Sequence, residues 1–289
     1  MIGGLQVRSN LLCVTWSAGR GHVFLYDLEE RLRISSWTTP VGPSGFSDAA
    51  GVAVDERFRV FVADPHNDCV RRYNAFGQHL GDLGLPPPES GDRGRDKQGV
   101  LDRPHGVAVW QERVYVAMGE RPRRRGVQCF HLDGRSLRGL SARGDASEKF
   151  AAPRAVFADE KGVVVADTLR GRLQCFRHGG AFVQEYSVAG PGELARPISV
   201  LRREDGSMLC VDRGGDRDRL VLVRADGTRG DGGELGEVCR EPIAVAADAR
   251  GRIYVLDHDG ERVVRGTAQL AFDEMLVDLA EHDLDAPLH

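Results

Sequence analysis

The sequence lacks the features of membrane-inserted and exported proteins. It contains no run of about eighteen apolar residues, the length that a membrane-spanning helix needs. The segment from Met1 to Trp16 has neither a cationic start nor the unbroken apolar core of a secretory signal. We therefore expect a soluble protein that is not exported, inserts into no membrane and resides in the cytoplasm.

An excess of charge of one sign is also lacking. The 39 basic residues are opposed by 43 acidic ones, which leaves a formal net charge of −4. A chain with this balance has no general electrostatic attraction for nucleic acid. With 41% hydrophobic residues the chain can bury a large core, which excludes disorder as its main state.

One pattern recurs along the chain. Each copy begins with a run of alanine and valine, followed by a polar turn and a β-branched run that ends in an anchor residue. A second turn and a run of alternating residues complete the copy. Five clear copies begin at Gly51, Pro104, Pro153, Pro197 and Pro242, and an eroded sixth copy begins the chain. Their anchors, spaced 49, 54, 49, 45 and 45 residues apart, are Thr15, Asp64, Met118, Asp167, Asp212 and Asp257.

Each copy accommodates four short antiparallel strands and contains no long run of helical period. Four strands repeated at this period indicate propeller blades. We predict an all-β fold, a six-bladed β-propeller of four-stranded antiparallel blades, forming a single domain over residues 1–280 with a frayed tail at 281–289. Residues 269–280 could form an outer strand or a short helix that buries Leu270, Met275, Leu276 and Leu279. We favour a strand for the first half of that segment.

Small residues recur at one position of the first strand in each clear copy. Six strands that converge on an axis leave no room there for large side chains. We therefore place this position on the innermost strands, and its residues are Gly51, Gly106, Ala155, Ser199 and Ala244.

The motifs resemble those of a known family. The segment Gly190–Pro197 is similar to the inter-blade signature of NHL-repeat propellers, and the segments Ala63–Arg71 and Ala166–Phe176 resemble the body of that repeat. The chain departs from the family pattern at Met118, where an aspartate is usual. The resemblance implies a six-bladed propeller, and some propellers of this family bind RNA or, as lyases of peptidyl-hydroxyglycine, hold zinc through histidines.

The cysteines fall at equivalent positions of different copies. Cys13 and Cys210 share the second-strand position, and Cys129 and Cys175 share the third-strand position. Equivalent positions in adjacent blades lie farther apart than the Cα separation of about 7 Å that a disulfide can span. Neither Cys69 nor Cys239 has a neighbouring cysteine at metal-ligand spacing. We expect six free thiols that fill the core.

Two readings are open for the recurring aspartates. A ring of carboxylates could bind a metal or act in acid–base chemistry. Alternatively, each aspartate closes its own blade by accepting backbone N–H bonds from the following turn, which we favour because the residue repeats in four copies. His66 and His258 lie close to two of these aspartates, but no serine or cysteine nucleophile accompanies them in the sequence.

Antiparallel strands bring certain loops to one face: the starts of the first strands, the turns between the second and third strands, and the links between blades. The link Leu85–Gln98 and the turn Gly119–Arg125 are longer than their counterparts on this face. His105 occupies the position from which the lyases supply zinc ligands, but its equivalents are Arg154, Ile198 and Ile243, so no histidine trio can form. We predict a binding face with the residues His66, Arg103, His105, Arg121, Arg123, Arg124, Arg125 and Arg154.

These features favour a binding or scaffolding propeller over an enzyme. We expect a protein or peptide partner with acidic groups, because arginine pairs with carboxylates, and we expect no cofactor, no metal and no catalytic set. One alternative is a hydrolase or lyase that uses His105, His66 or His258 with an acidic partner. Another is an RNA-binding propeller that uses Arg121–Arg125, although no aromatic residue for base stacking lies within that turn.

Overall fold

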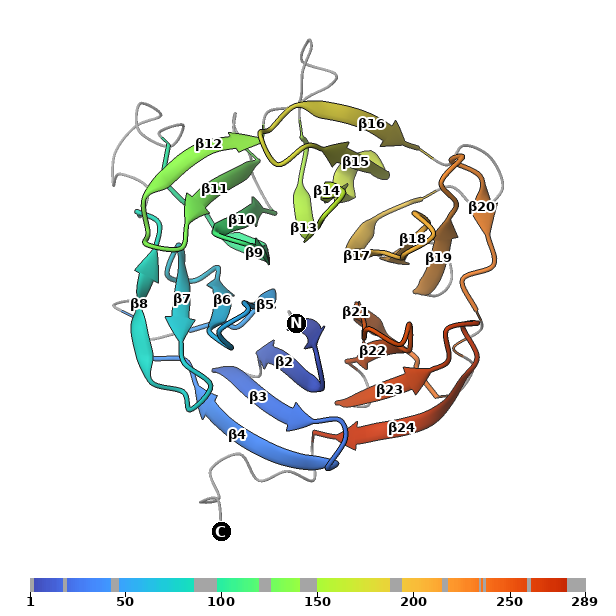
Figure 1. Ribbon diagram of the computed structural model, residues 1–289, viewed down its shortest axis with the longest axis horizontal. Coiled ribbons are helices and arrows are strands. Elements are labelled where there is room, and N and C mark those ends of the chain that lie inside the picture. The colour runs from blue at the N-terminus through green and yellow to red at the C-terminus, as the bar shows by residue number, and fades with distance from the viewer. Residues whose placement is uncertain are drawn as a thin grey trace.

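The computed structural model confirms the propeller. It describes residues 3–17, 20–42, 47–85, 98–119, 126–140, 150–187, 194–214, 218–233, 235, 238–258 and 261–279. These residues form six four-stranded sheets, and within each sheet the strands are antiparallel and follow the order of the chain (Figure 1). The predicted tail at 281–289 lies outside the described residues.

The first three blades come from the N-terminal half of the chain. Blade 1 contains β1 (Gly3–Arg8), β2 (Leu11–Ser17), β3 (Gly21–Asp27) and β4 (Leu32–Thr38). Blade 2 contains β5 (Val52–Val54), β6 (Val60–Asp64), β7 (Cys69–Tyr73) and β8 (His79–Leu83). Blade 3 contains β9 (Pro104–Trp110), β10 (Arg113–Met118), β11 (Val127–His131) and β12 (Ser136–Leu140).

The other three blades complete the ring. Blade 4 contains β13 (Pro153–Asp159), β14 (Gly162–Asp167), the 3-10 turn η1 (Thr168–Arg170), β15 (Arg172–Phe176) and β16 (Phe182–Tyr186). Blade 5 contains β17 (Pro197–Arg202), β18 (Met208–Asp212), β19 (Arg219–Val223) and the two-residue β20 (Arg229–Gly230). Blade 6 contains β21 (Pro242–Ala247), β22 (Ile253–Asp257), β23 (Arg262–Gly266) and β24 (Phe272–Asp278). The described residues include no helix long and apolar enough to span a bilayer.

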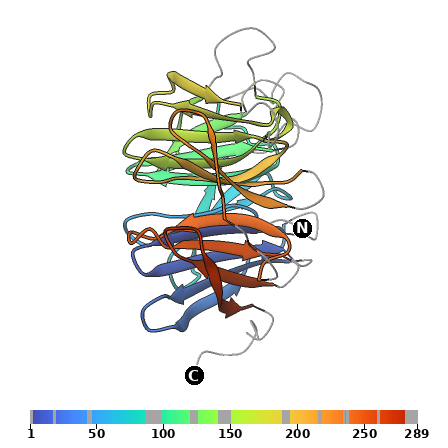
Figure 2. The same ribbon diagram turned by 90° about the vertical axis from the view of Figure 1, so that its right-hand side faces the viewer.

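The first strand of every blade lies at the centre of the ring and the last strand lies at its rim (Figure 1). Figure 2 shows the ring from the side, where it is thinner along its axis than across. The predicted small residues lie where they were expected: Gly106, Ala155, Ser199 and Ala244 are on the innermost strands, and Gly51 directly precedes one. Blade 1 supplies Gly4 at the same place.

Close approach of backbones explains why these residues are small. A Cβ atom at Gly51 would lie 2.5 Å from the carbonyl oxygen of His105, and one at Gly106 would lie 2.6 Å from the carbonyl oxygen of Arg154. The Gly51 N–H group donates to the His105 carbonyl over 2.7 Å, so neighbouring blades are joined by a backbone hydrogen bond next to the axis. A larger side chain would separate the blades and break this contact.

The ring closes between blade 1 and blade 6 without exchange of a strand. All four strands of blade 1 come from the start of the chain, and all four strands of blade 6 come from its described end. One apolar cluster joins the two blades, and it includes Leu5, Tyr26, Ile243 and Leu256. Side-chain packing therefore holds the two ends of the chain together.

The segment after Arg265 is a strand, which resolves the two possibilities that the sequence left open. β24 runs through Asp278, so the strand continues beyond the first half of the segment. The helical alternative would have buried Leu270, Met275, Leu276 and Leu279. In the observed strand and its flanks Leu270, Leu276 and Leu279 are buried, whereas the Met275 side chain is 50% exposed.

All six cysteines are free and buried. Cys13 lies on β2 and Cys210 on β18, and Cys129 and Cys175 lie on β11 and β15, as their repeat positions predicted. Burial raises the pKa of Cys69 to about 12, and burial also raises the pKa of Cys13. The reactive thiolate is therefore scarce at neutral pH.

We expect a thiol reagent to detect almost no free thiol in the folded protein and six thiols after denaturation without reductant. The reason is that all six side chains are buried and the pKa shifts of Cys13 and Cys69 disfavour the thiolate. A colorimetric thiol titration in native buffer and in guanidinium chloride measures both values. Fewer than six thiols in the denatured protein would reveal a disulfide.

Candidate functional site

The recurring aspartates hold the links between blades. Asp167 is fully buried, and its carboxylate accepts hydrogen bonds from the backbone N–H groups of Ala151 and Ala152, both over 2.9 Å. The Arg172 guanidinium, on the next strand, donates to the same carboxylate over 3.2 Å. Each carboxylate thus joins an incoming link to the second and third strands of its blade.

The same arrangement recurs in other blades. Asp212 accepts from the N–H group of Arg196 over 2.7 Å and from the Arg219 guanidinium over 3.1 Å. Asp257 accepts from the N–H group of Glu241 over 2.9 Å. The structural role that we favoured is therefore correct, but in these blades the N–H donors come from the preceding link. Asp64 also accepts from the following turn, at the N–H groups of His66 and Asn67.

Two blades replace the aspartate and keep a bond to the link. The Thr15 hydroxyl donates to the carbonyl oxygen of Ala50. The Met118 sulfur accepts from the N–H group of Asp102 over 3.4 Å. The fold therefore tolerates the departures from the repeat pattern, because both substitutes still contact a link: Met118 contacts the link that enters its own blade, and Thr15 contacts the link that leaves its blade for blade 2.

Each aspartate is bonded to the link and the strand of its own blade, and the aspartates do not form a shared metal site. No group of three histidine, cysteine, aspartate or glutamate side chains within the described ranges is arranged to hold a metal ion. The position from which lyases of peptidyl-hydroxyglycine supply zinc ligands is the second residue of an innermost strand. In β9, β13, β17 and β21 this residue is His105, Arg154, Ile198 and Ile243.

His66 is paired with a carboxylate at the seam between blades 1 and 2. Its Nδ1 atom lies 3.2 Å from an oxygen of Asp48, and its side chain is 44% exposed. The other oxygen of Asp48 accepts from the Ser17 hydroxyl over 2.6 Å. Because this hydroxyl donates to the carboxylate and not to the imidazole, the three residues do not form a nucleophile–base arrangement.

The structure brings His105 and Arg154 together at one mouth of the central channel. Both side chains pack over Gly119, where an added Cβ atom would lie 2.4 Å from His105 Cδ2 and 2.9 Å from Arg154 Cγ. His105 is 5% exposed. Gly119 begins the basic turn, so the base of that turn lies at the channel mouth.

Arg103 contacts a different part of the face, the turn of blade 2 that contains His66. It is exposed, and its N–H group donates over 2.7 Å to the carboxylate of Asp68, in the same turn as His66. The predicted face thus contains one cationic group over Gly119 and another at the seam between blades 2 and 3.

The two insertions begin and end at different places. The turn is closed by a hydrogen bond from the Met118 N–H group to the Gly126 carbonyl over 2.9 Å. The ends of the long link are joined where Leu85 bonds with Gly99 and Leu101, and Gln98 donates to the Ser136 carbonyl on β12, the outer strand of blade 3. Arg121, Arg123, Arg124, Arg125 and most of the link lie outside the described residues.

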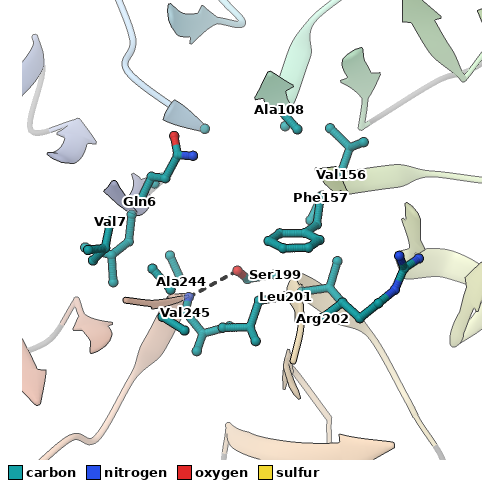
Figure 3. A pocket seen from close by; sticks show the side chains of 18 of the residues that line it. Gln6, Val7, Ala108, Val156, Phe157, Ser199, Leu201, Arg202, Ala244 and Val245 are labelled. Carbon is teal, nitrogen blue, oxygen red and sulfur yellow. Dashed lines mark hydrogen bonds between the residues drawn. The ribbon is translucent and has the colours of Figure 1, made fainter. Parts of the chain in front are cut away.

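A central cavity of about 740 Å³ lies on the propeller axis (Figure 3). Side chains from β1, β9, β13, β17 and β21 line its wall, and they include Gln6, Phe157, Ser199 and Leu201. The sequence analysis considered the mouth and missed this interior. A signal was present in Phe157, an aromatic residue that follows Ala155 and Val156 inside the innermost strand β13.

Comparisons with known proteins support the fold. No family model and no curated protein sequence matches the chain. Among solved structures, a streptogramin B lyase is similar with a TM-score of 0.64 and 14% identity, over 94% of this chain and 81% of the lyase. Virginiamycin B lyase from Staphylococcus aureus gives 0.63 and 14%, over 93% and 82%. A chain of a nidogen/laminin complex gives 0.62 and 16%, over 92% of each chain. At these identities the likeness shows the six-bladed propeller fold.

Replacement of Asp167 by alanine should lower the free energy of unfolding by about 3–5 kcal/mol, because it leaves two link N–H groups without their acceptor and removes one of the two carboxylates paired with the buried Arg172, which keeps Glu185. Glu160→Ala, at an exposed turn of the same blade, should change stability little. Urea denaturation of both variants measures the difference. A loss of less than about 1 kcal/mol for Asp167→Ala, the range of a surface ion pair, would contradict the structural role.

Proposed function

We propose that this propeller is a binding module that presents the channel-mouth face of blades 3 and 4 to an acidic segment of a protein or peptide. The single observation that carries the proposal is the packing of His105 and Arg154 over Gly119. This contact joins the basic turn to two further cationic or titratable side chains on one face. A partner that touches the turn would therefore also meet the mouth.

The chemistry of the face favours carboxylates. Arginine pairs with carboxylates through two parallel N–H donors and is more weakly hydrated than lysine. Arg213, which also lines the cavity, already shows this preference, since it donates to Asp218 over 3.0 Å and to Glu241 over 2.7 Å. An acidic peptide would offer Arg154 and the four arginines of the turn the same type of contact.

The similar structures are consistent with binding. One similar chain belongs to a complex of nidogen with laminin, and it covers 92% of this propeller. The streptogramin B and virginiamycin B lyases share the fold, which does not by itself indicate their activity. For the lyases of peptidyl-hydroxyglycine in the resembled family, the zinc-ligand position is filled in this chain by His105, Arg154, Ile198 and Ile243, with one histidine. These features support the binding proposal over the lyase alternative.

Replacement of Arg121, Arg123, Arg124 and Arg125 by serine should weaken binding of a partner identified by co-purification at least tenfold, which is about 1.4 kcal/mol. The melting temperature should stay unchanged, because the turn is closed at its base by Met118 and Gly126. Isothermal titration calorimetry with the purified partner measures the affinity, and a thermal melt measures the stability.

A matched control removes four exposed arginines from turns on the opposite face, at Arg57, Arg177, Arg224 and Arg250. The control should bind the partner as the unmodified protein does. An equal loss of affinity in both variants would mean that the effect comes from net charge alone. No loss of affinity in either variant would mean that the partner binds elsewhere. Binding of single-stranded RNA that weakens steeply with salt and depends on the same turn would favour the RNA alternative.

A further inference from the structure

We propose that the central cavity is a binding site for a small apolar carboxylate. The proposal goes beyond partner binding on the outer face: it shares His105 and Arg154 at the mouth with that proposal, and rests otherwise on interior residues such as Gln6, Phe157 and Ser199. A volume of about 740 Å³ lies within the range of about 300–1,000 Å³ that is typical of ligand sites. The chemistry of the wall defines the class of ligand.

The middle of the cavity wall is apolar. Figure 3 shows Phe157 on one side of the cavity and Val7 on the other, with Leu201 and Val245 on neighbouring strands. Ordered water needs two to four polar partners, and such a wall supplies few. Weakly held water is displaced favourably by an apolar group, so the wall favours an apolar ligand body.

Two polar side chains of the wall offer hydrogen-bond donors. The Gln6 carbonyl oxygen accepts from the Val54 N–H group, and the Ser199 hydroxyl oxygen accepts from the Val245 N–H group over 3.1 Å. Each of these oxygens thus already accepts one bond, whereas the Gln6 amide N–H₂ and the Ser199 O–H donate to no partner among the described residues. In Figure 3 both groups border the cavity. A ligand that meets both therefore needs acceptor oxygens.

The charges around the cavity favour an anion. His105 and Arg154 line its mouth. Arg202 also belongs to the lining, but it is paired with Asp159 over 2.6 Å and points away from the axis (Figure 3). The acidic residues of the lining, Glu204, Asp205 and Asp248, lie at the turn end of the cavity, where Arg203 and Arg250 also line it. The residues Gly4, Gln6, Phe157 and Ser199 of the wall carry no negative charge. A small apolar carboxylate combines acceptor oxygens, one negative charge and an apolar body.

The test uses two fluorescent probes with one ring skeleton. The anion 8-anilinonaphthalene-1-sulfonate stands in for the carboxylate, and N-phenyl-1-naphthylamine lacks the anionic group. We expect the anion to bind the folded protein at one site per chain, more tightly than the neutral probe, and to be displaced by 2-naphthoate. Fluorescence titration of the purified protein measures both affinities and the stoichiometry.

Gln6→Glu keeps an oxygen for the Val54 N–H group but replaces the amide donor with an anionic oxygen. This substitution should lower the affinity for the anionic probe at least tenfold and the affinity for the neutral probe less than threefold. Gln184→Glu is the matched control, because it makes the same change on the exposed strand β16 and should leave both affinities unchanged.

A second pair of variants keeps the proposal testable if Gln6→Glu does not fold. Phe157→Leu should lower the affinity for both probes, whereas Phe182→Leu on the exposed outer strand should lower neither affinity. The proposal is overturned if the anion shows no saturable site, or if the cavity variants bind it as their controls do. Because the serine variant of the basic turn should bind the probes normally, failure here and failure of the partner proposal are separate outcomes.

Discussion

The ring depends on a buried carboxylate at the end of the second strand in four of its six blades. Asp64, Asp167, Asp212 and Asp257 are fully buried, and each accepts both from backbone N–H groups and from an arginine of the next strand. A buried carboxylate is stable only when its charge is paired and its lone pairs are occupied. Each aspartate therefore determines where the incoming link crosses the blade and where the following strand begins.

This constraint separates the loops from the core. Since each link is held where it enters its blade, the chain beyond that point can change length at little cost. The long link between Leu85 and Gln98 leaves and returns at one set of backbone bonds, and the basic turn does the same between Met118 and Gly126. The variable segments are thus added to a ring whose geometry they do not determine, as is usual for binding loops on rigid scaffolds.

The interior follows from a second constraint, the close approach of six innermost strands. Glycine or a small residue is needed where the backbones nearly touch, as at Gly51 and Gly106. Farther along the same strands the backbones leave space for side chains, and the cavity next to Phe157 and Gln6 results. Blade contact and cavity wall thus come from the same strands, at different residues.

The sequence by itself determined the number of blades, the small residues at the axis and the positions of the cysteines. These are local or periodic properties: a repeat of four short strands specifies its own blade, and equivalent positions recur in each copy. Only the tertiary structure decided which donors the aspartates meet, that Gly119 brings His105 to Arg154, and that Gln6 faces the cavity wall of blade 4. These contacts join residues far apart in the chain, such as Gln6 and Val54, and a repeat pattern does not specify which polar side chains meet across two blades. The strand at Phe272–Asp278 was ambiguous for the same reason, because its burial depends on packing against blade 1 at the closure of the ring.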